Sequence, residues 1–381
     1  MAASHYLDHA STSPLRAEAR AAIESWIASD AGTMGDPARV HAAGRATRFA
    51  IEEAREKVAE FLGARPREVV FTSGGTESIN MAVHGAARAR PGQPIVAAGV
   101  EHSAVRDASA RAAPVVTVAV DRAGRIDPES VREALSAPGG VGLVNCQLAN
   151  HEVGTVQPCA EIVDLCRAAG VLVHVDAAAA VGHLSFDFAS LGADLCSVSG
   201  HKLGGPTGIG VLLIRRGLRI DPLLVGGDQE RARRGGFENA LGILGLGAVA
   251  AALSPVDLAA EVATDLGRTQ AIRAVVAGLS DVEILGPTDP SRRLSNLVSV
   301  AIGRVESEAV LLALDRAGIS VHSGSACSSE SLQPSPVLAA MGVDADRSLR
   351  VSVGWGTTDE DIAAFSEALP DVVERLRALS R

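Results

Sequence analysis

The segment VLVHVDAAAAVGHLSFDFASLGADLCSVSGHKLGG (171–205) contains the pattern from which the architecture of the chain follows. It begins with one apolar run, VLVHVDA (171–177), and ends with another, LCSVS (195–199), and the 26 residues from Asp176 to Lys202 are enough for a helix and a return strand. Apolar runs bounded by turn residues predict buried strands, and a helical crossover makes two such strands parallel. Because parallel strands end at the same edge of a sheet, Asp176 and Lys202 are expected to meet there.

The same alternation of strand and helix extends over about 69–216. Val-rich runs and helical patterns alternate in this region, which predicts an α/β fold with a mainly parallel sheet covered on both faces. The other five predicted strands are VVFTS (69–73), IVAAG (95–99), VVTVAV (115–120), VGLVNC (141–146) and GVLLI (210–214), which makes a seven-stranded sheet. A helix is predicted over 158–170, with Gly170 as its C-cap. We expect a large domain over 13–256 and a smaller α+β domain built from 1–12 and 257–381.

Composition excludes several classes of protein. Hydrophobic residues make up 47% and charged residues 21% of the 381 residues, as in a globular protein with a large core. A net charge of −10 and 3% aromatic residues argue against direct nucleic-acid binding. We expect no membrane span, because no apolar run is long enough, and the N-terminal residues lack a signal-peptide pattern. Five cysteines without a CxxC pair indicate neither a disulfide scaffold nor a metal site, so a cytoplasmic location is expected.

Lysine use is unusual in this chain. Only two of its 35 basic residues are lysines, namely Lys57 in a polar stretch and Lys202 among apolar residues and glycines. Arginine cannot form an imine, whereas lysine can when its surroundings lower its pKa. Lys202 is therefore either a surface lysine or a Schiff-base lysine.

Two further motifs favour the second interpretation. TSGGTES (72–78) joins a strand to a helix, and Gly75 and Thr76 there suit a phosphate at a helix N-terminus, although an ordinary capped helix has the same pattern. Asp176 ends an apolar strand, where a carboxylate either caps a helix or meets a cation. Pyridoxal phosphate needs a lysine, a carboxylate for its ring nitrogen and a phosphate cradle, and these residues supply all three. Ser199 and His201 flank the lysine and are candidate phosphate or ring-oxygen contacts.

Three other residues are candidates for the chemistry. His102 follows a strand and precedes a helix, so it is either structural or a proton-transfer residue that stacks on the cofactor ring. Cys327 lies in a loop of small polar residues, whereas the other four cysteines are predicted to be core residues. An exposed cysteine there indicates a nucleophile or sulfur carrier, or else a tolerated loop residue. Arg350 is either a surface residue or the group that holds a substrate carboxylate.

Together these motifs resemble those of the cysteine desulfurases, pyridoxal-phosphate enzymes of the class V aminotransferase group. The resemblance covers nearly the whole chain, and it is carried by YLDHASTSP (6–14), GDPARVHAAGR (35–45), FTSGGTES (71–78), EHSAV (101–105), NHEVGTVQP (150–158), VDAAAAVG (175–182), SVSGHKLGGPTGIG (197–210), GGDQERARRGG (226–236), SGSACSS (323–329) and LRVSVG (349–354). It implies the type I pyridoxal-phosphate transferase fold and an obligate homodimer with active sites at the interface.

The resemblance also implies a role for each candidate residue. Lys202 would bind the cofactor covalently, and Asp176 would pair with the ring nitrogen. His102 would stack on the ring and move protons, while Arg350 would bind the carboxylate of L-cysteine and Cys327 would attack its sulfur. Gly75, Thr76, Ser199 and His201 would hold the phosphate and nearby oxygens, and Asn150 and His151 would contact substrate or cofactor. The sulfur would pass to an acceptor, for example an iron–sulfur protein.

The chain departs from the family pattern at three positions. The family often has Asn-Asn-Glu where this chain has Asn150, His151 and Glu152. A glutamine that commonly contacts the ring oxygen is Ala179 here, and a threonine given to the partner's phosphate is Phe237. These changes indicate a specialised desulfurase, and the overall likeness is to the desulfurases of DNA phosphorothioation systems. Another pyridoxal-phosphate aminotransferase, a β-lyase and a selenocysteine lyase are the alternatives.

Overall fold

A seven-stranded sheet forms the centre of the larger part of the chain in the computed structural model, which describes residues 4–29, 35–323 and 334–379. The strand order is β2-β8-β7-β6-β5-β3-β4, in which β8 is antiparallel to both neighbours and all other neighbours are parallel. The strands are β2 (Val69–Thr72), β3 (Ile95–Ala98), β4 (Val115–Val118), β5 (Leu143–Gln147), β6 (Leu172–Asp176), β7 (Leu195–Ser199) and β8 (Gly210–Ile214). The predicted seven-stranded, mainly parallel sheet is therefore confirmed.

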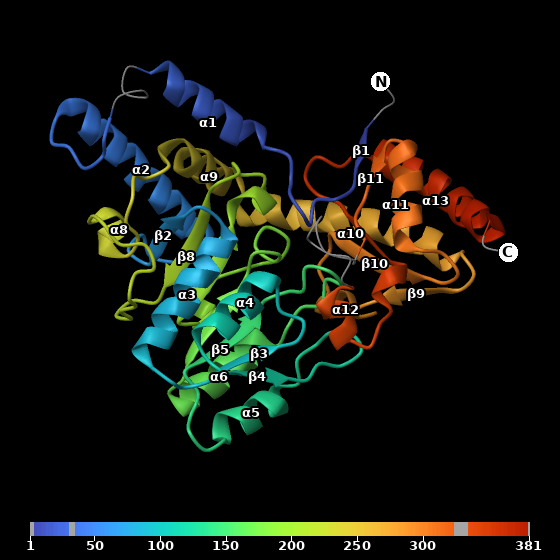
Figure 1. Cartoon of the computed structure of the whole chain (residues 1–381). Helices are drawn as coiled ribbons and strands as arrows, with labels where there is room; N and C mark the ends of the chain where they lie inside the picture. The colour runs from blue at the N-terminus through green and yellow to red at the C-terminus, as the bar shows by residue number, and fades with distance from the viewer. Residues whose placement is uncertain (1–3, 30–34, 324–333, 380–381) are drawn as a thin grey trace.

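Helices cover both faces of this sheet (Figure 1). The surrounding helices are α1 (Ala17–Ala28), α2 (Ala42–Phe61), α3 (Gly75–Ala89), α4 (Ser103–Ala112), α5 (Pro128–Ser136), α6 (Cys159–Ala169), α7 (Phe188–Leu191), α8 (Gln229–Ala232) and α9 (Ala240–Ala252). Adjacent residues of one strand belong to different hydrophobic clusters, because Val69 lies in the cluster that contains Ala54 of α2 and Val249 of α9, whereas Val70 lies in the cluster that contains Met81 of α3. Helix α6 ends at Gly170, whose φ of 66° is left-handed, so the predicted C-cap is confirmed.

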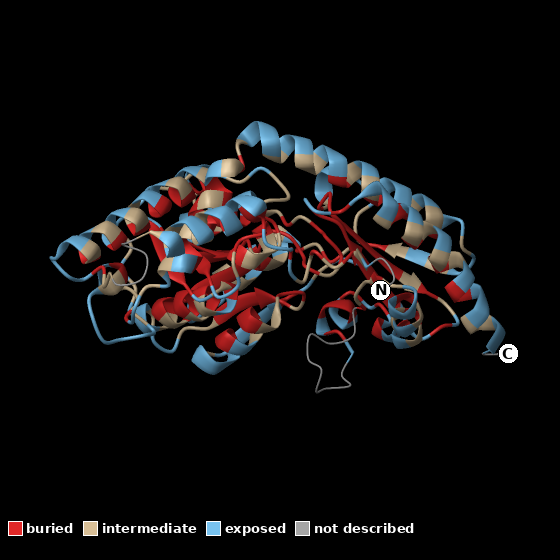
Figure 2. Cartoon of the chain, turned by 90° about the horizontal axis from the view of Figure 1, so that it is seen from above, coloured by how far each residue is buried: buried red, intermediate tan, exposed pale blue. Residues whose placement is uncertain are grey.

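The C-terminal part of the chain builds a second, smaller α+β unit. It contains an antiparallel three-stranded sheet, the long helix α10 and two further helices around a separate hydrophobic cluster. Its elements are α10 (Pro255–Ala277), β9 (Val282–Leu285), β10 (Leu297–Ile302), α11 (Ser307–Arg316), β12 (Ser348–Ser352) and α13 (Asp359–Leu379). Figure 2 shows buried residues gathered in both units. The predicted α+β character is confirmed, while the exact limits 13–256, 1–12 and 257–381 stay a prediction.

Two short segments tie the units together. Strand β1 (His5–Tyr6) runs parallel to β11 (Ile319–Ser320), and Leu7 packs in the smaller cluster. Helix α12 (Pro336–Ala340) instead packs Val337 against the larger cluster. The N-terminal segment and α12 therefore both lie where the units meet, and residues from both units line the site described below.

Four cysteines of the large unit are buried and free, as predicted for core residues. The described residues include no group of three or more His, Cys, Asp or Glu side chains that could hold a metal ion. Within the same residues, no single helix is long and apolar enough to cross a bilayer; α9 and α10 meet that criterion only as a pair bent by 83°.

Candidate functional site

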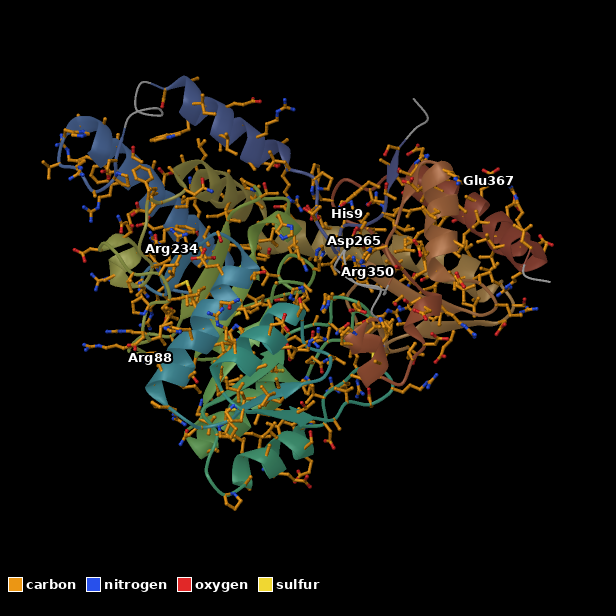
Figure 3. All side chains as sticks on the ribbon, in the orientation of Figure 1. His9, Arg88, Arg234, Asp265, Arg350 and Glu367 are labelled. Carbon is orange, nitrogen blue, oxygen red and sulfur yellow. The ribbon has the colours of Figure 1, made fainter. Side chains whose placement is uncertain are left out.

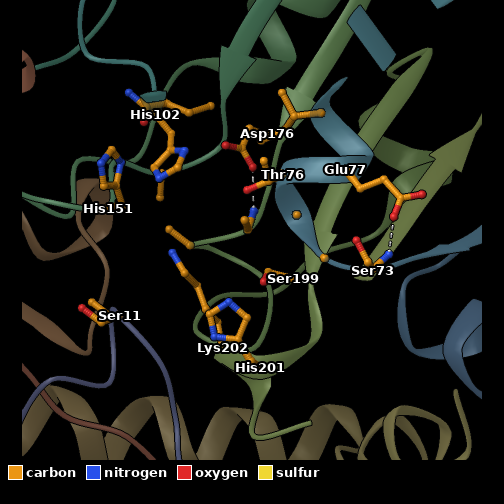
Figure 4. A pocket seen from close by; sticks show the side chains of 18 of the residues that line it. Ser11, Ser73, Thr76, Glu77, His102, His151, Asp176, Ser199, His201 and Lys202 are labelled. Atoms are coloured by element: carbon orange, nitrogen blue, oxygen red, sulfur yellow. Dashed lines mark hydrogen bonds between the residues drawn. The ribbon is translucent and has the colours of Figure 1, made fainter. Parts of the chain in front are cut away.

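A pocket of about 410 Å³ lies at the carboxyl edge of the large sheet (Figure 4). The loops that follow β2, β3, β5, β6 and β7 form most of its wall, as expected for a parallel sheet. The N-terminal segment and β12 add the rest. Of the predicted site residues, those that line it are Gly75, Thr76, His102, His151, Asp176, Ser199, His201, Lys202 and Arg350. A volume of this size suits a small organic ligand.

Lys202 lies on a short 3-10 turn, Gly200–Leu203, directly after β7. Its amine points into the pocket, toward the side on which His102 and Asp176 lie (Figure 4). The turn packs so closely on β8 and its preceding residue that only glycine fits at position 200, since a Cβ there would lie 2.8 Å from the Ile209 side chain. Close packing therefore holds the lysine at the sheet edge, where the sequence predicted it.

Asp176 is the last residue of β6, and its side chain enters the pocket floor. One carboxylate oxygen accepts a hydrogen bond from the Ala178 amide at 3.0 Å. Burial raises the pKa of Asp176, and the Ala178 amide and the charges of Lys202 and His151 oppose that shift only in part. A positive charge beside this carboxylate would offset the cost of burying it.

The glycine turn before α3 forms the phosphate-sized end of the pocket. The helix begins at Gly75, and a Cβ on that residue would lie 3.4 Å from the Ser199 Cβ, so the glycine leaves room between two walls. Backbone amides at the start of a 15-residue helix attract anions. The Thr76 and Ser199 hydroxyls and the His201 ring add polar groups around the same space.

Glu77 would repel an anion in this turn, but Arg234 and the Ser73 amide already compensate its negative charge. Its carboxylate accepts hydrogen bonds from the Ser73 amide at 2.8 Å and from Arg234 at 2.9 Å. Burial raises the pKa of Glu77, but the bonds from Arg234 and Ser73 outweigh it and lower the pKa overall. The ion pair thus both pins the turn and neutralises the acidic residue nearest to the anion site.

His102 caps helix α4, and its Nδ1 accepts the Ala104 amide hydrogen at 3.1 Å. Burial, followed by the charges of His151, Lys202 and Arg106, lowers the pKa of His102 to about 3. The ring is therefore neutral at pH 7, and its hydrogen sits on Nε2. It stands edge-on to His151, with the ring centres 5.0 Å apart.

Arg350 reaches the pocket from β12, where the two units meet (Figure 3). Its Nη1 donates to the His151 carbonyl at 3.0 Å, and its Nη2 donates to Asp8 at 2.9 Å and to Ser11 at 2.6 Å. Its Nε is buried and has no hydrogen-bond partner within the part of the chain that the structure describes. The guanidinium is thus preoriented by the protein, and its Nε hydrogen and one Nη1 hydrogen have no partner among the described residues.

The structure does not bring every predicted residue into the pocket. Asn150 is fully buried outside it, where its side chain donates to the Val100 carbonyl and accepts from the amides of Glu152 and Val153. Its predicted contact with substrate has no support in this arrangement. Cys327 lies outside the described residues, so its predicted role stays a prediction.

The two remaining departures from the family pattern occupy different places. Ala179 lines the pocket with a methyl group and offers no hydrogen bond. Phe237 is 65% exposed and lies beside a separate hollow of about 70 Å³ that also borders the strand before the glycine turn.

Other pocket residues were not predicted. Ser11 and Gln147 line the wall, and Asp8 holds Arg350. Glu101 is fully buried beneath the floor, where burial and the nearby charge of Asp176 raise its pKa to about 8. Asp8 and Ser11 lie in the N-terminal motif and Glu101 directly precedes His102, which was the only available signal for them. Gln147 lies outside the quoted motifs and had no such signal.

The residues present fit pyridoxal phosphate. The pocket combines an amine, a buried carboxylate that needs a cation, and a glycine-lined helix N-terminus that favours an anion. These are the three protein groups that this cofactor requires. Lys202 would hold the aldehyde carbon, Asp176 the ring nitrogen, and the Gly75–Thr76 turn the phosphate.

Comparison with known proteins agrees with this assignment. The class-V aminotransferase family model matches residues 5–365. The chain is 41% identical to the cysteine desulfurase IscS of Dictyoglomus turgidum, over 98% of this chain and 96% of the relative. It is 42% identical to the IscS-like cysteine desulfurase of Mycobacterium tuberculosis, over 98% and 97%. The NifS-like protein of Rickettsia africae has a similar structure, with a TM-score of 0.88, 28% identity and coverage of 98% and 100%. The chain therefore belongs to the class-V aminotransferase family, whose members use pyridoxal phosphate.

Proposed function

We infer that the chain is a pyridoxal-phosphate-dependent cysteine desulfurase. The observation that carries this conclusion is the convergence of Lys202, Asp176 and the glycine turn on one pocket, in a chain that is 41–42% identical to cysteine desulfurases over 98% of its length. The reaction converts L-cysteine and the Cys327 thiol into L-alanine and a Cys327 persulfide. The substrate C–S bond breaks, an S–S bond forms, and hydrogen replaces sulfur on Cβ.

The residues of the pocket have distinct tasks in this reaction. Arg350 binds the substrate carboxylate through the N–H groups that the described residues leave without a partner. The chemistry that pyridoxal phosphate supplies when bound is the withdrawal of electrons from Cα of the amino acid. The Lys202 amine, which points into the pocket, takes the Cα proton, and Asp176 stabilises positive charge at the pocket floor. His102 is neutral and offers its Nε2 hydrogen to a substrate atom.

The test of this function is a paired assay on the holoprotein and its Cys327→Ser variant. The holoprotein should form L-alanine from L-cysteine, and intact-mass analysis should find added sulfur on the peptide that contains Cys327. The variant should keep its bound cofactor but form no persulfide. Normal sulfide release by Cys327→Ser, or pyruvate rather than alanine as the product, would favour a β-lyase instead.

A homodimer is part of the same proposal. Its support is a set of exposed apolar side chains on α2, just before α2 and on the segment around α8, namely Val40, Phe49, Val225 and Phe237. Residues of α2 and of that segment line a shared hollow of about 570 Å³, so the two elements lie side by side. Light scattering should give twice the chain mass, and Phe49→Arg should lower it toward the monomer.

The destination of the sulfur is the remaining part of the proposal. We expect an acceptor protein in the cytoplasm, with iron–sulfur assembly and DNA phosphorothioation as the two candidate pathways. The IscS names of the relatives favour the first, and the overall likeness of the sequence favours the second. Incubation of ³⁵S-labelled persulfide enzyme with each candidate acceptor would separate them, because label should move only to the true acceptor.

A further inference from the structure

Two imidazoles share one wall of the pocket, but the protein holds them differently. The Nδ1 of His102 accepts the Ala104 amide hydrogen, and its other nitrogen carries the ring hydrogen. His102 therefore has no lone pair to offer unless the cap of α4 breaks. Its burial, and the pKa of about 3 that follows, also oppose any gain of a proton. The ring stands ready to donate a hydrogen bond, and it is poorly suited to act as a base.

His151 is held the opposite way. Its Nε2 lies 3.5 Å from a carboxylate oxygen of Glu152, and its ring stands at 72° to that of His102 (Figure 4). A carboxylate beside one ring nitrogen keeps the hydrogen there and leaves the lone pair on the other. Of the two imidazoles on this wall, His151 is thus the one with a ring nitrogen, Nδ1, that can accept a proton.

Glu152 is itself fixed as a carboxylate. The Ser335 hydroxyl, at the cap of α12, donates to its other oxygen at 2.6 Å. Burial raises the pKa of Glu152, but the hydrogen bonds from His151 and Ser335 and the charge of Arg350 outweigh it and lower the pKa overall. Ser335, Glu152 and His151 form a chain of contacts that runs from the smaller unit into the pocket.

We infer that His151, oriented by Glu152, is the base that takes a proton from the ammonium group of the incoming amino acid. This inference rests on the proposed function, because an ammonium has no lone pair and must lose a proton before its nitrogen can react. One substrate N–H bond breaks, its electron pair stays on nitrogen, and the proton joins Nδ1 of His151. Glu152 stabilises the resulting imidazolium, which gives its proton to water before the next turnover. Glu152 and Ser335 are positioning residues.

Several charged groups near His151 favour or oppose the imidazolium that this step forms. The titratable and charged groups that face the ring or share its pocket are Glu77, His102, Glu152, Asp176, His201, Lys202, His322 and Arg350. The carboxylates favour the imidazolium and the cations oppose it. Glu152 is the acidic group in direct contact with the ring.

Rapid mixing of the holoprotein with L-cysteine tests the inference through the first change in cofactor absorbance. His151→Asn should slow this phase by about 10² to 10⁴ at pH 7, as loss of a general base does. The defect should shrink as pH rises, because a growing share of cysteine then arrives with a free amine. His102→Asn is the matched control, and its defect should keep the same factor at every pH.

Rescue experiments separate proton transfer from packing. Added imidazoles should restore the first phase in His151→Ala, faster for the more basic ones, and should show no such trend in His102→Ala. Glu152→Gln should slow the phase, and Glu152→Asp should recover part of it. In the protein without cofactor, ¹⁵N spectra should place the His151 hydrogen on Nε2, and Glu152→Gln should move part of it to Nδ1.

A first phase in His151→Asn within twofold of the holoprotein at pH 7, or a defect of constant size at every pH, would overturn the inference. Ser335→Ala, which lies outside the pocket, gives a second measure through a smaller slowing of the same phase if a His151 variant fails to fold. Alanine formation by the unaltered protein is measured in parallel. If no alanine forms, the proposed function fails; if alanine forms and His151→Asn is normal, only this inference fails.

Discussion

Arg55 offers a matched test of how the fold supports the glycine turn. Its guanidinium donates to Glu230 through two bonds of 2.7 Å, and both side chains are at most 3% exposed. It also contacts Glu52, but that carboxylate is 42% exposed. Glu230 in addition accepts the Phe71 amide at 2.9 Å, just before the turn. One arginine thus has a buried and a solvated partner of the same chemical type.

Glu230→Gln should lower the free energy of unfolding by about 3 to 5 kcal/mol, because it leaves a buried guanidinium without its counter-charge. Glu52→Gln should cost at most about 1 kcal/mol, because water already screens that pair. Urea denaturation of the cofactor-free protein measures both. Glu230→Gln should also weaken pyridoxal phosphate binding, since Phe71 anchors the strand that leads into the turn. Equal costs for the two substitutions would show that burial does not govern this pair.

Three further substitutions probe the pocket. Glu101 has a pKa raised to about 8 by burial and by Asp176, against an ordinary value of 4.5. Between those values the residue is ionised in the unfolded chain and protonated in the folded one, so the free energy of unfolding falls as pH rises. Glu101→Gln should therefore gain stability relative to the unaltered protein from pH 4.5 to 8 in urea denaturation, and a pH-independent difference would contradict this. Asp176→Asn should weaken cofactor binding about ten- to a hundredfold by equilibrium dialysis, as loss of a charged hydrogen bond does, while the surface change Asp164→Asn should leave it unaltered. Arg350→Lys should raise KM for L-cysteine about tenfold or more with a smaller effect on kcat, because lysine lacks the planar fork that binds a carboxylate; an unchanged KM in steady-state assays would remove Arg350 from substrate binding.

The sequence predicted the parts of the site that depend on local pattern and chain order. Asp176 and Lys202 lie at one sheet edge because the crossover between their strands is helical, and that pattern is visible in the residues alone. The glycine turn before α3 was equally visible, because it separates a strand from a helix.

Long-range contacts explain what the sequence could not predict. Arg350 is held by Asp8, 342 residues away, and Glu152 by Ser335, 183 residues away. No local periodicity encodes such pairings, which arise only when distant parts of the chain fold against each other. Asn150 is a case in which the motif suggested a ligand contact that the structure does not show. Its side chain instead donates to the Val100 carbonyl and accepts from the Val153 amide.

Peptide mapping after borohydride reduction of the holoprotein decides whether Lys202 carries the cofactor. The chain has only two lysines, so Lys57, on the exposed side of α2 and paired with Glu53, is a built-in control. We predict a phosphopyridoxyl mass on the peptide that contains Lys202 and none on the peptide that contains Lys57. A cofactor mass on Lys57 alone, or on neither lysine, would contradict the assignment of this pocket.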